Sequence, residues 1–99
     1  MVPRDDLIQY VNDYLQVDQV KDYSPAGLQV EGKEQVHKIV TAVSAGARLF
    51  QQAVEWQADM IIVHHGLFWD RDPRVVRGPL KSRLKTLLQN DITLLGYHL

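Results

Sequence analysis

The fold is decided by a short apolar run that ends in two histidines and a glycine, Met60-Ile61-Ile62-Val63-His64-His65-Gly66. Four consecutive apolar residues, most of them β-branched, are typical of a buried strand. Two further runs of this kind stand at residues 39–43 and 92–95, and the first of these is expected to be covered on both faces. The sequence therefore predicts a sheet built around three apolar strands.

Helical patterns separate these strands and precede them. Strands that alternate with helices at this spacing imply right-handed crossovers between parallel strands. The 99 residues therefore predict a single α/β domain with three layers, in which helices flank a mostly parallel sheet. The remaining elements are a helix from Pro3 to about Asp18, a turn-rich connection at 21–27, a short strand at 28–30, a helix after Ser44 as its candidate cap, a loop at 64–79 and a helix at 80–88.

The composition of the chain excludes some kinds of binding partner and of metal site. The chain has no cysteine, which excludes disulfides and thiolate ligands and leaves histidines and carboxylates to bind a metal. A formal charge of -1 lacks the basic excess of nucleic-acid binders, so nucleic acid is not expected as a partner. No apolar run approaches the roughly 20 residues that span a bilayer, and the start has no apolar leader. We therefore expect a cytoplasmic protein without a membrane partner.

Three of the four histidines are expected at one edge of the sheet. The carboxyl ends of parallel strands meet at one edge, where ligands bind. His64, His65 and His98 follow strand ends, whereas His37 precedes its strand and belongs to the opposite edge. Adjacent strand residues point to opposite faces, so His64 and His65 converge only if the strand has ended, as Gly66 favours, or if each binds a different metal ion. The alternative is a polar loop without a metal.

The loop that follows the two histidines carries further candidates. Phe68 and Trp69 could form an apolar wall beside a substrate, or could pack the loop onto the core. Asp70 and Asp72 could be ligands, but their surroundings are typical of an exposed turn, which we favour. Arg77 precedes a helix N-terminus, where phosphate is readily held, although a plain transition from loop to helix explains it as well.

Three segments together resemble a known protein family. The segments are Asp22-Tyr23-Ser24-Pro25-Ala26-Gly27-Leu28-Gln29-Val30-Glu31-Gly32, Ile61-Ile62-Val63-His64-His65-Gly66-Leu67-Phe68-Trp69 and Tyr97-His98-Leu99. With them the chain resembles, over essentially its whole length, the NGG-interacting-factor-three-like family, whose members are often named type-two GTP cyclohydrolase I homologues. Ser24 and Ala26 stand where the family commonly has a cysteine and an asparagine, and this departure affects no metal ligand.

The resemblance implies a metal-dependent, hydrolase-like protein. It implies two divalent metal ions in each complete site, with His64 and His65 among their ligands, inside a toroidal homohexamer. His98 would line the site together with Phe68 and Trp69. The nominal reaction is the hydrolytic opening of a purine nucleotide ring, with GTP as the small-molecule substrate. A metal-binding scaffold or regulatory interaction protein without catalysis is the alternative that we retain.

The family's site also contains an aspartate that follows the segment around His98, and a more distant histidine and glutamate. These positions lie beyond Leu99, so we expect the 99 residues to be the N-terminal part of such a protein, weakly active or inactive by themselves. The strand at 92–95 is then expected at an open edge of the sheet, where it would favour self-association.

Overall fold

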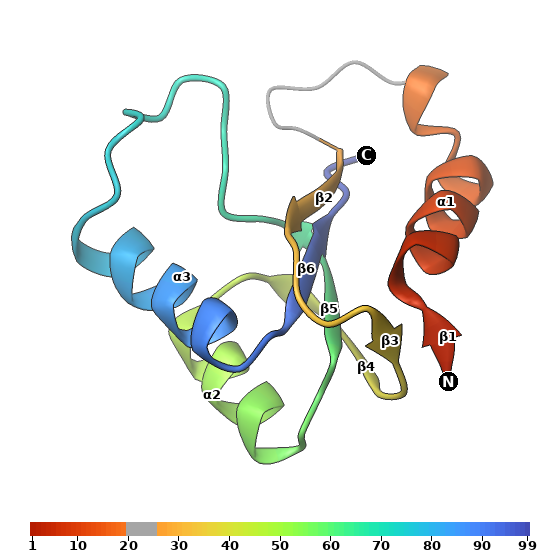
Figure 1. Cartoon of the computed structure of the whole chain (residues 1–99). Coiled ribbons are helices and arrows are strands. Elements are labelled where there is room, and N and C mark those ends of the chain that lie inside the picture. Colours follow the sequence, from red (N-terminus) through yellow and green to blue (C-terminus); the bar gives the residue numbers. More distant parts are fainter. Residues whose placement is uncertain (20–25) are drawn as a thin grey trace.

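A four-stranded sheet forms the middle layer of the protein (Figure 1). Its strands are β2 (Gly27–Val30), β4 (Ile39–Ser44), β5 (Met60–His65) and β6 (Thr93–Gly96). The strand order is β2-β6-β5-β4, with β5 parallel to both of its neighbours and β2 antiparallel to β6. This confirms the predicted mostly parallel sheet. The computed structural model describes residues 1–19 and 26–99, so most of the connection expected at 21–27 lies outside the described residues.

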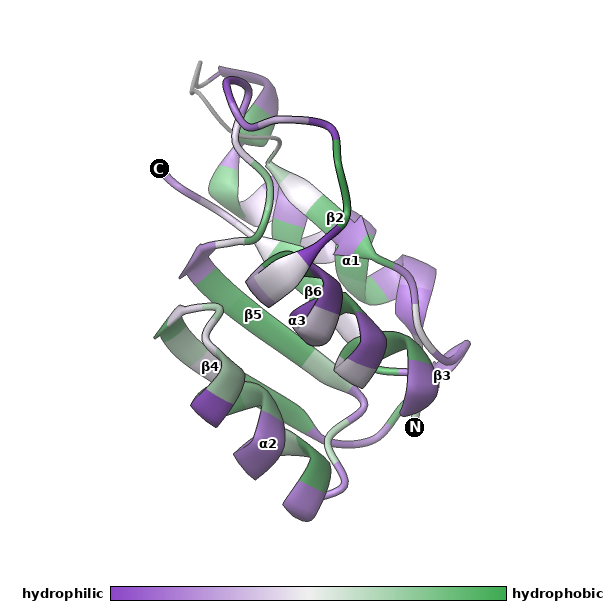
Figure 2. Cartoon of the chain, turned by 90° about the vertical axis from the view of Figure 1, so that its left-hand side faces the viewer, coloured by the Kyte–Doolittle hydropathy of each residue, from purple (hydrophilic) through white to green (hydrophobic). Residues whose placement is uncertain are grey.

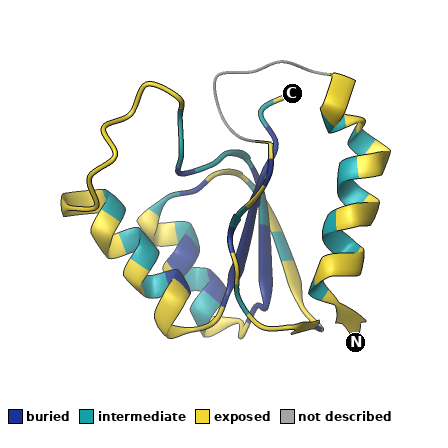
Figure 3. Cartoon of the chain, turned by 45° about the horizontal axis from the view of Figure 1, so that its top comes forward, coloured by how far each residue is buried: buried dark blue, intermediate teal, exposed yellow. Residues whose placement is uncertain are grey.

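Helices cover both faces of the sheet, which confirms the three layers (Figures 1 and 3). Two of them, α2 (Ala47–Glu55) and α3 (Gly78–Gln89), lie on one face, and α1 (Arg4–Leu15) lies on the other. Two short strands that the sequence did not predict, β1 (Val2–Pro3) and β3 (Gln35–Val36), pair antiparallel next to α1. No helix in the described part of the chain is long and apolar enough to cross a membrane.

Two helix boundaries differ from the sequence prediction. α1 ends at Leu15 rather than near Asp18, because Gln16 adopts the left-handed backbone conformation (φ 53°) that closes a helix. Ser44, the expected cap of α2, is instead the last residue of β4, and Gly46 takes the cap position. The hydroxyl of Ser44 is therefore left at the carboxyl edge of the sheet.

β5 contributes to a hydrophobic core on each face of the sheet. Ile61 and Val63 belong to the core under α2 and α3, while Met60 belongs to the core under α1. The alternation follows from the pleat of a strand, and it explains why β5 is apolar up to its two final histidines (Figure 2). Other members are Phe50, Ala53, Leu87 and Leu94 in the first core, and Val36, Leu95 and Tyr97 in the second.

The two outer positions of the sheet differ from the sequence prediction. The prediction that β4 is covered on both faces is wrong: β4 is an edge strand, and Ile39 and Val43 are 44% and 65% exposed. Only its other face, with Val40 and Ala42, packs against the core under α2 and α3. The expectation that β6 is an open edge is also wrong, because β2 pairs with its second side. The edge strands of the sheet are therefore β2 and β4, not β6.

Candidate metal centre

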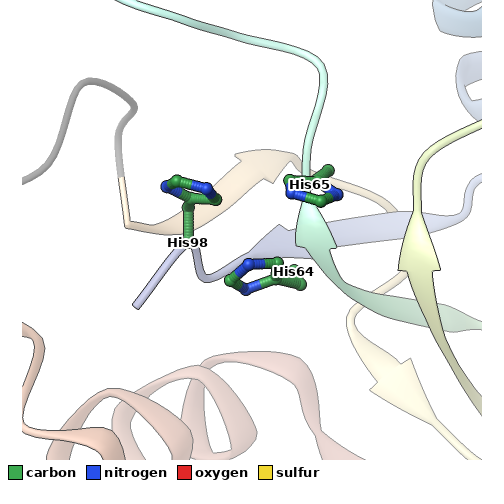
Figure 4. Close-up of side chains that lie close together, drawn as sticks. All are labelled: His64, His65 and His98. Carbon is green, nitrogen blue, oxygen red and sulfur yellow. The ribbon is translucent and has the colours of Figure 1, made fainter.

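The three histidines expected at the carboxyl edge lie side by side (Figure 4). His64 and His65 are the last residues of β5, just past the final β5–β6 pair of Val63 with Gly96, and His98 lies two residues past β6. The ring centroid of His64 is 4.5 Å from that of His65 and 4.6 Å from that of His98. The centroids of His65 and His98 are 5.2 Å apart. The prediction that these histidines share one edge is confirmed.

The loop expected from residue 64 begins only at Gly66. β5 still pairs with β4 as far as His65, whose partner is Ser44, but its ladder with β6 has already ended. A strand end with one remaining neighbour can twist more freely. Both rings therefore approach His98, although adjacent residues in a regular strand point to opposite faces.

The nitrogen atoms of these rings are spaced closely enough for metal binding. One ring nitrogen from each of His64, His65 and His98 lies within 4.8 Å of the others. Imidazole nitrogens bind zinc at about 2.0–2.1 Å, so the nitrogens of one tetrahedral site lie about 3.4 Å apart. Ring shifts of roughly 1 Å would therefore bring all three nitrogens onto a single ion. The donor set fits a divalent metal that accepts imidazole ligands.

Hydrogen bonds orient the rings of His64 and His65. His64 Nδ1 lies 3.0 Å from the backbone oxygen of Tyr97. A carbonyl oxygen only accepts, so Nδ1 of His64 carries the proton and donates it, and Nε2 has its lone pair directed away from this bond. The Ser44 hydroxyl lies 3.2 Å from His65 Nδ1, and this hydrogen bond orients the His65 ring. Such outer partners are typical of histidines that bind metals.

Tyr97 ties this edge of the sheet to α1. Its backbone N–H donates to the oxygen of Val63 at 2.8 Å, and its phenol donates to Asn12 Oδ1 at 2.6 Å. Burial raises the pKa of Tyr97 to about 12, so the phenol keeps its proton and remains a donor. The carbonyl that orients His64 is therefore held in place from two sides.

Gly66 is required for a different reason from the one that the sequence suggests. Among the described residues, the glycines with positive φ are Gly27 and Gly78, so Gly66 does not serve as a flexible strand terminator. A Cβ at Gly66 would instead fall on the side chain of Gln29, whose Oε1 accepts a hydrogen bond from Leu67 N–H at 2.8 Å. This bond fixes the start of the loop directly after the histidines.

The two aromatic residues of the loop have different surroundings. Trp69 lies edge-on to His98 at 5.0 Å between ring centroids, and 6.2 Å from His65. Phe68 packs against the core under α2 and α3. Both also line an apolar hollow of about 380 Å³. Trp69 is thus the residue that borders the histidines, and Phe68 mainly anchors the loop.

The acidic residues of the loop lie apart from the histidines. Asp70 and Asp72 are exposed, and the N–H of Asp72 donates to the oxygen of Trp69 in a turn. The prediction of an exposed turn is confirmed. Within the described residues, no carboxylate joins the cluster of three histidines.

His37 lies at the opposite edge, as predicted, beside an aspartate that sequence reasoning missed. Asp59 Oδ2 accepts from the backbone N–H groups of His37 at 2.8 Å and Lys38 at 3.0 Å, and its Oδ1 pairs with Lys33 Nζ at 2.9 Å. Burial raises the pKa of the Asp59 carboxyl, but these hydrogen bonds outweigh burial and hold the pKa below its usual value. The only sequence signal was an acid directly before an apolar strand.

Comparison with known proteins identifies a family model that matches this chain. Residues 2–99 match the family model described as Duf34/NIF3 (NGG1p interacting factor 3). Over 94 residues the chain is 55% identical to the GTP cyclohydrolase 1 type 2 homolog of Salmonella typhimurium, and 53% identical to that of Escherichia coli strain K12. These alignments cover 95% of this chain but 38% of each relative. The chain therefore spans well under half the length of these curated relatives.

Solved structures share the fold. The protein ybgI, described as of unknown function, superposes with a TM-score of 0.95 at 50% identity, over 98% of this chain and 39% of that one. TTHA1606 from Thermus thermophilus gives a TM-score of 0.93 at 46% identity, over 99% of this chain and 40% of that one. HcgD from Methanocaldococcus jannaschii, at 23% identity and a TM-score of 0.85, shares the fold over 96% of this chain and 39% of its own.

Proposed function

Since this chain belongs to the Duf34/NIF3 (NGG1p interacting factor 3) family, we propose that it contributes a divalent-metal site to a metal-dependent hydrolase, with His64, His65 and His98 as ligands. The observation that carries the proposal is the spacing of the three ring nitrogens within 4.8 Å of one another. The hydrogen bond from His64 Nδ1 to the Tyr97 carbonyl supports the proposal, because it leaves Nε2 as the nitrogen that would bind the ion. The resemblance alone implies that His98 lines the site, and its position beside His64 and His65 supports the further role of a ligand.

A divalent ion held here would lower the pKa of a bound water toward neutrality and polarise a substrate. The chain itself orients His64 and His65 through Tyr97 and Ser44, and the Trp69 ring borders one side of the cluster. Three imidazoles carry no negative charge to hold two cations close together. We therefore assign one ion to these three residues. The second ion of a complete site would need carboxylates that the described residues do not bring to the cluster.

For the whole protein we propose hydrolytic opening of a purine nucleotide ring. This follows the name GTP cyclohydrolase 1 type 2 homolog that its relatives carry. We place the reaction in a ring-shaped homohexamer in the cytoplasm. Because the chain covers 38% of those relatives, we expect it to be weakly active or inactive by itself.

A metal-binding scaffold without catalysis is the second candidate. One observation favours it: within the described residues no aspartate or glutamate joins the histidines, and a hydrolase normally positions a general base beside the attacking water. An open coordination position with turnover would identify the hydrolase, and a closed site without turnover would identify the scaffold.

The test is metal content and affinity, measured by elemental analysis and by calorimetric titration with zinc. We expect one ion for each chain, no binding by the double variant His64→Ala/His65→Ala, and at least tenfold weaker binding by His98→Ala. His37→Ala is the matched control, because it removes an imidazole at the opposite edge and should leave binding unchanged. Full metal content in the double variant, or equal loss in the control, would refute the assignment.

A further inference from the structure

The helix α1 packs against the sheet with little buried surface. None of its residues is fully buried, and its apolar side chains, such as Leu7 and Val11, are only partly covered by the core that contains Met60 and Tyr97 (Figure 3). Segments with few buried apolar contacts open locally at a low cost in free energy. Individual hydrogen bonds from α1 to the sheet layer therefore contribute much to holding the helix in place.

Two polar side chains of α1 bind the layer beneath the helix. Arg4, in the first turn, donates to the backbone oxygen of Gly32 at 2.8 Å. Asn12, in the third turn, accepts the phenol proton of Tyr97 through Oδ1 at 2.6 Å. Tyr97 directly follows β6 and directly precedes His98. The bond from Asn12 therefore reaches the edge of the sheet that carries the histidines.

Gly27 leaves the space that the Asn12 amide occupies. Gly27 is the first residue of β2, and it pairs with Gly96, the last residue of β6. A Cβ at Gly27 would lie 3.1 Å from Oδ1 and 3.5 Å from Nδ2 of Asn12. The amide is thus confined between α1 and the point where β2 begins and β6 ends, which restricts the directions in which it can bind Tyr97.

Tyr97 connects this amide to the histidine cluster. Its phenol is held by Asn12, and its backbone N–H donates to the oxygen of Val63 at 2.8 Å. Its carbonyl accepts from His64 Nδ1 at 3.0 Å. A metal site requires ligand distances within about 0.2 Å of their ideal values, so a small shift of this carbonyl would change how well His64 fits an ion. The position of that carbonyl depends on the docking of α1.

We propose that Asn12 is a positioning residue for the metal site, and that metal binding at the histidines is coupled to the docking of α1. The inference rests on the proposed metal site and names the element that regulates it. The coupling acts in both directions, because linkage between two equilibria is reciprocal. The docked helix favours the ion by fixing His64, and the bound ion favours the docked helix by the same factor.

Zinc affinity of the 99-residue chain, measured by calorimetric titration, tests the role of Asn12. Losing a direct outer partner of a ligand weakens metal binding about 10- to 100-fold, and Asn12 acts through one further residue, so Asn12→Ala should weaken zinc binding about three- to tenfold. Asn12→Asp keeps an acceptor oxygen for the phenol and should restore binding. Gln9→Ala is the matched control, because the amide of Gln9 bonds along the same helix, to Asp13.

Two further measurements separate positioning from general support of the fold. Asn12→Ala and Tyr97→Phe remove the same hydrogen bond, so the double variant should bind zinc no more weakly than the weaker single variant. Zinc should also slow hydrogen exchange at the amides of α1 in the unaltered chain, but not in Tyr97→Phe. Tyr97→Phe keeps its ring in the core, so it preserves the test if Asn12→Ala does not fold.

Several results would overturn the inference while leaving the metal site in place. They are unchanged zinc affinity in Asn12→Ala and Tyr97→Phe, an equal loss in Gln9→Ala, additive losses in the double variant, and failure of Asn12→Asp to restore binding. Exchange in α1 that zinc leaves unchanged would overturn the coupling. Absence of zinc binding by the unaltered chain would instead refute the metal site itself, and the inference with it.

Discussion

Replacing Gly66 by alanine should loosen the loop directly after His64 and His65. The new Cβ would occupy the space of the Gln29 side chain, which can swing aside only by giving up its 2.8 Å bond to Leu67 N–H. Losing a partner for a half-buried N–H costs about 1–3 kcal/mol, so the free energy of unfolding should fall by about that amount. With a urea m-value of about 1–3 kcal/mol/M, the midpoint should fall by roughly 1 M.

Urea unfolding of a double-mutant cycle tests this reasoning. Gln29→Ala should destabilise the chain about as much as Gly66→Ala, and the double variant should be no worse than either, because both changes remove the same bond. Gly46→Ala is the control, since a Cβ there meets nothing within 4 Å, and its effect should stay within about 1 kcal/mol. Additive losses in the double variant, or an unchanged midpoint for Gly66→Ala, would refute the role given to Gln29.

Other consequences can be tested on the same chain. Asp59→Asn should lower stability at neutral pH by about 1–3 kcal/mol. Hydrogen bonds hold the pKa of Asp59 in the folded protein below its value in the unfolded chain, so this stabilisation is present above about pH 4 and is lost as the pH falls further. The stability curves of the unaltered chain and of Asp59→Asn should therefore merge in acid, and a constant difference between them would contradict the prediction. Tyr97→Phe should cost about 0.5–1.5 kcal/mol through the lost bond to Asn12, with Tyr10→Phe, an exposed residue, as the control. If β4 mediates self-association, Val43→Lys should lower the sedimenting mass at high concentration, and an unchanged mass would exclude this edge.

The sequence predicts the layers of the fold and the edge that carries the histidines. Both follow from local patterns, because uninterrupted apolar runs indicate strands and parallel strands share a carboxyl edge. Such patterns do not predict which strands lie at the edges of the sheet. β4 has an apolar sequence like that of β5, yet α1 packs over β5 and β6 and leaves Ile39 and Val43 exposed. Likewise, only tertiary pairing places β2 beyond β6.

The partners of the site are harder to predict than its histidines. Gln29, Ser44 and Tyr97 support the cluster from three separate segments, and none of them has a sequence pattern that points to a histidine. The sequence shows a glycine after His65, but it does not predict why a side chain is disfavoured at that position. Its φ is not in the region that favours glycine, and the constraint is a side chain from a distant strand.

The register between β5 and β6 brings the third histidine to the first two. Continued two residues past its last pair, this ladder sets His98 beside His65. Tyr97 holds the register beyond the strand ends, with its N–H on the oxygen of Val63 and its phenol on Asn12. A slip of one residue would turn the side chain of His98 to the opposite face of the sheet. The grouping of the three histidines therefore depends on the packing of α1 against this edge as well as on the strands. The spacing of the histidines in the sequence does not predict that packing.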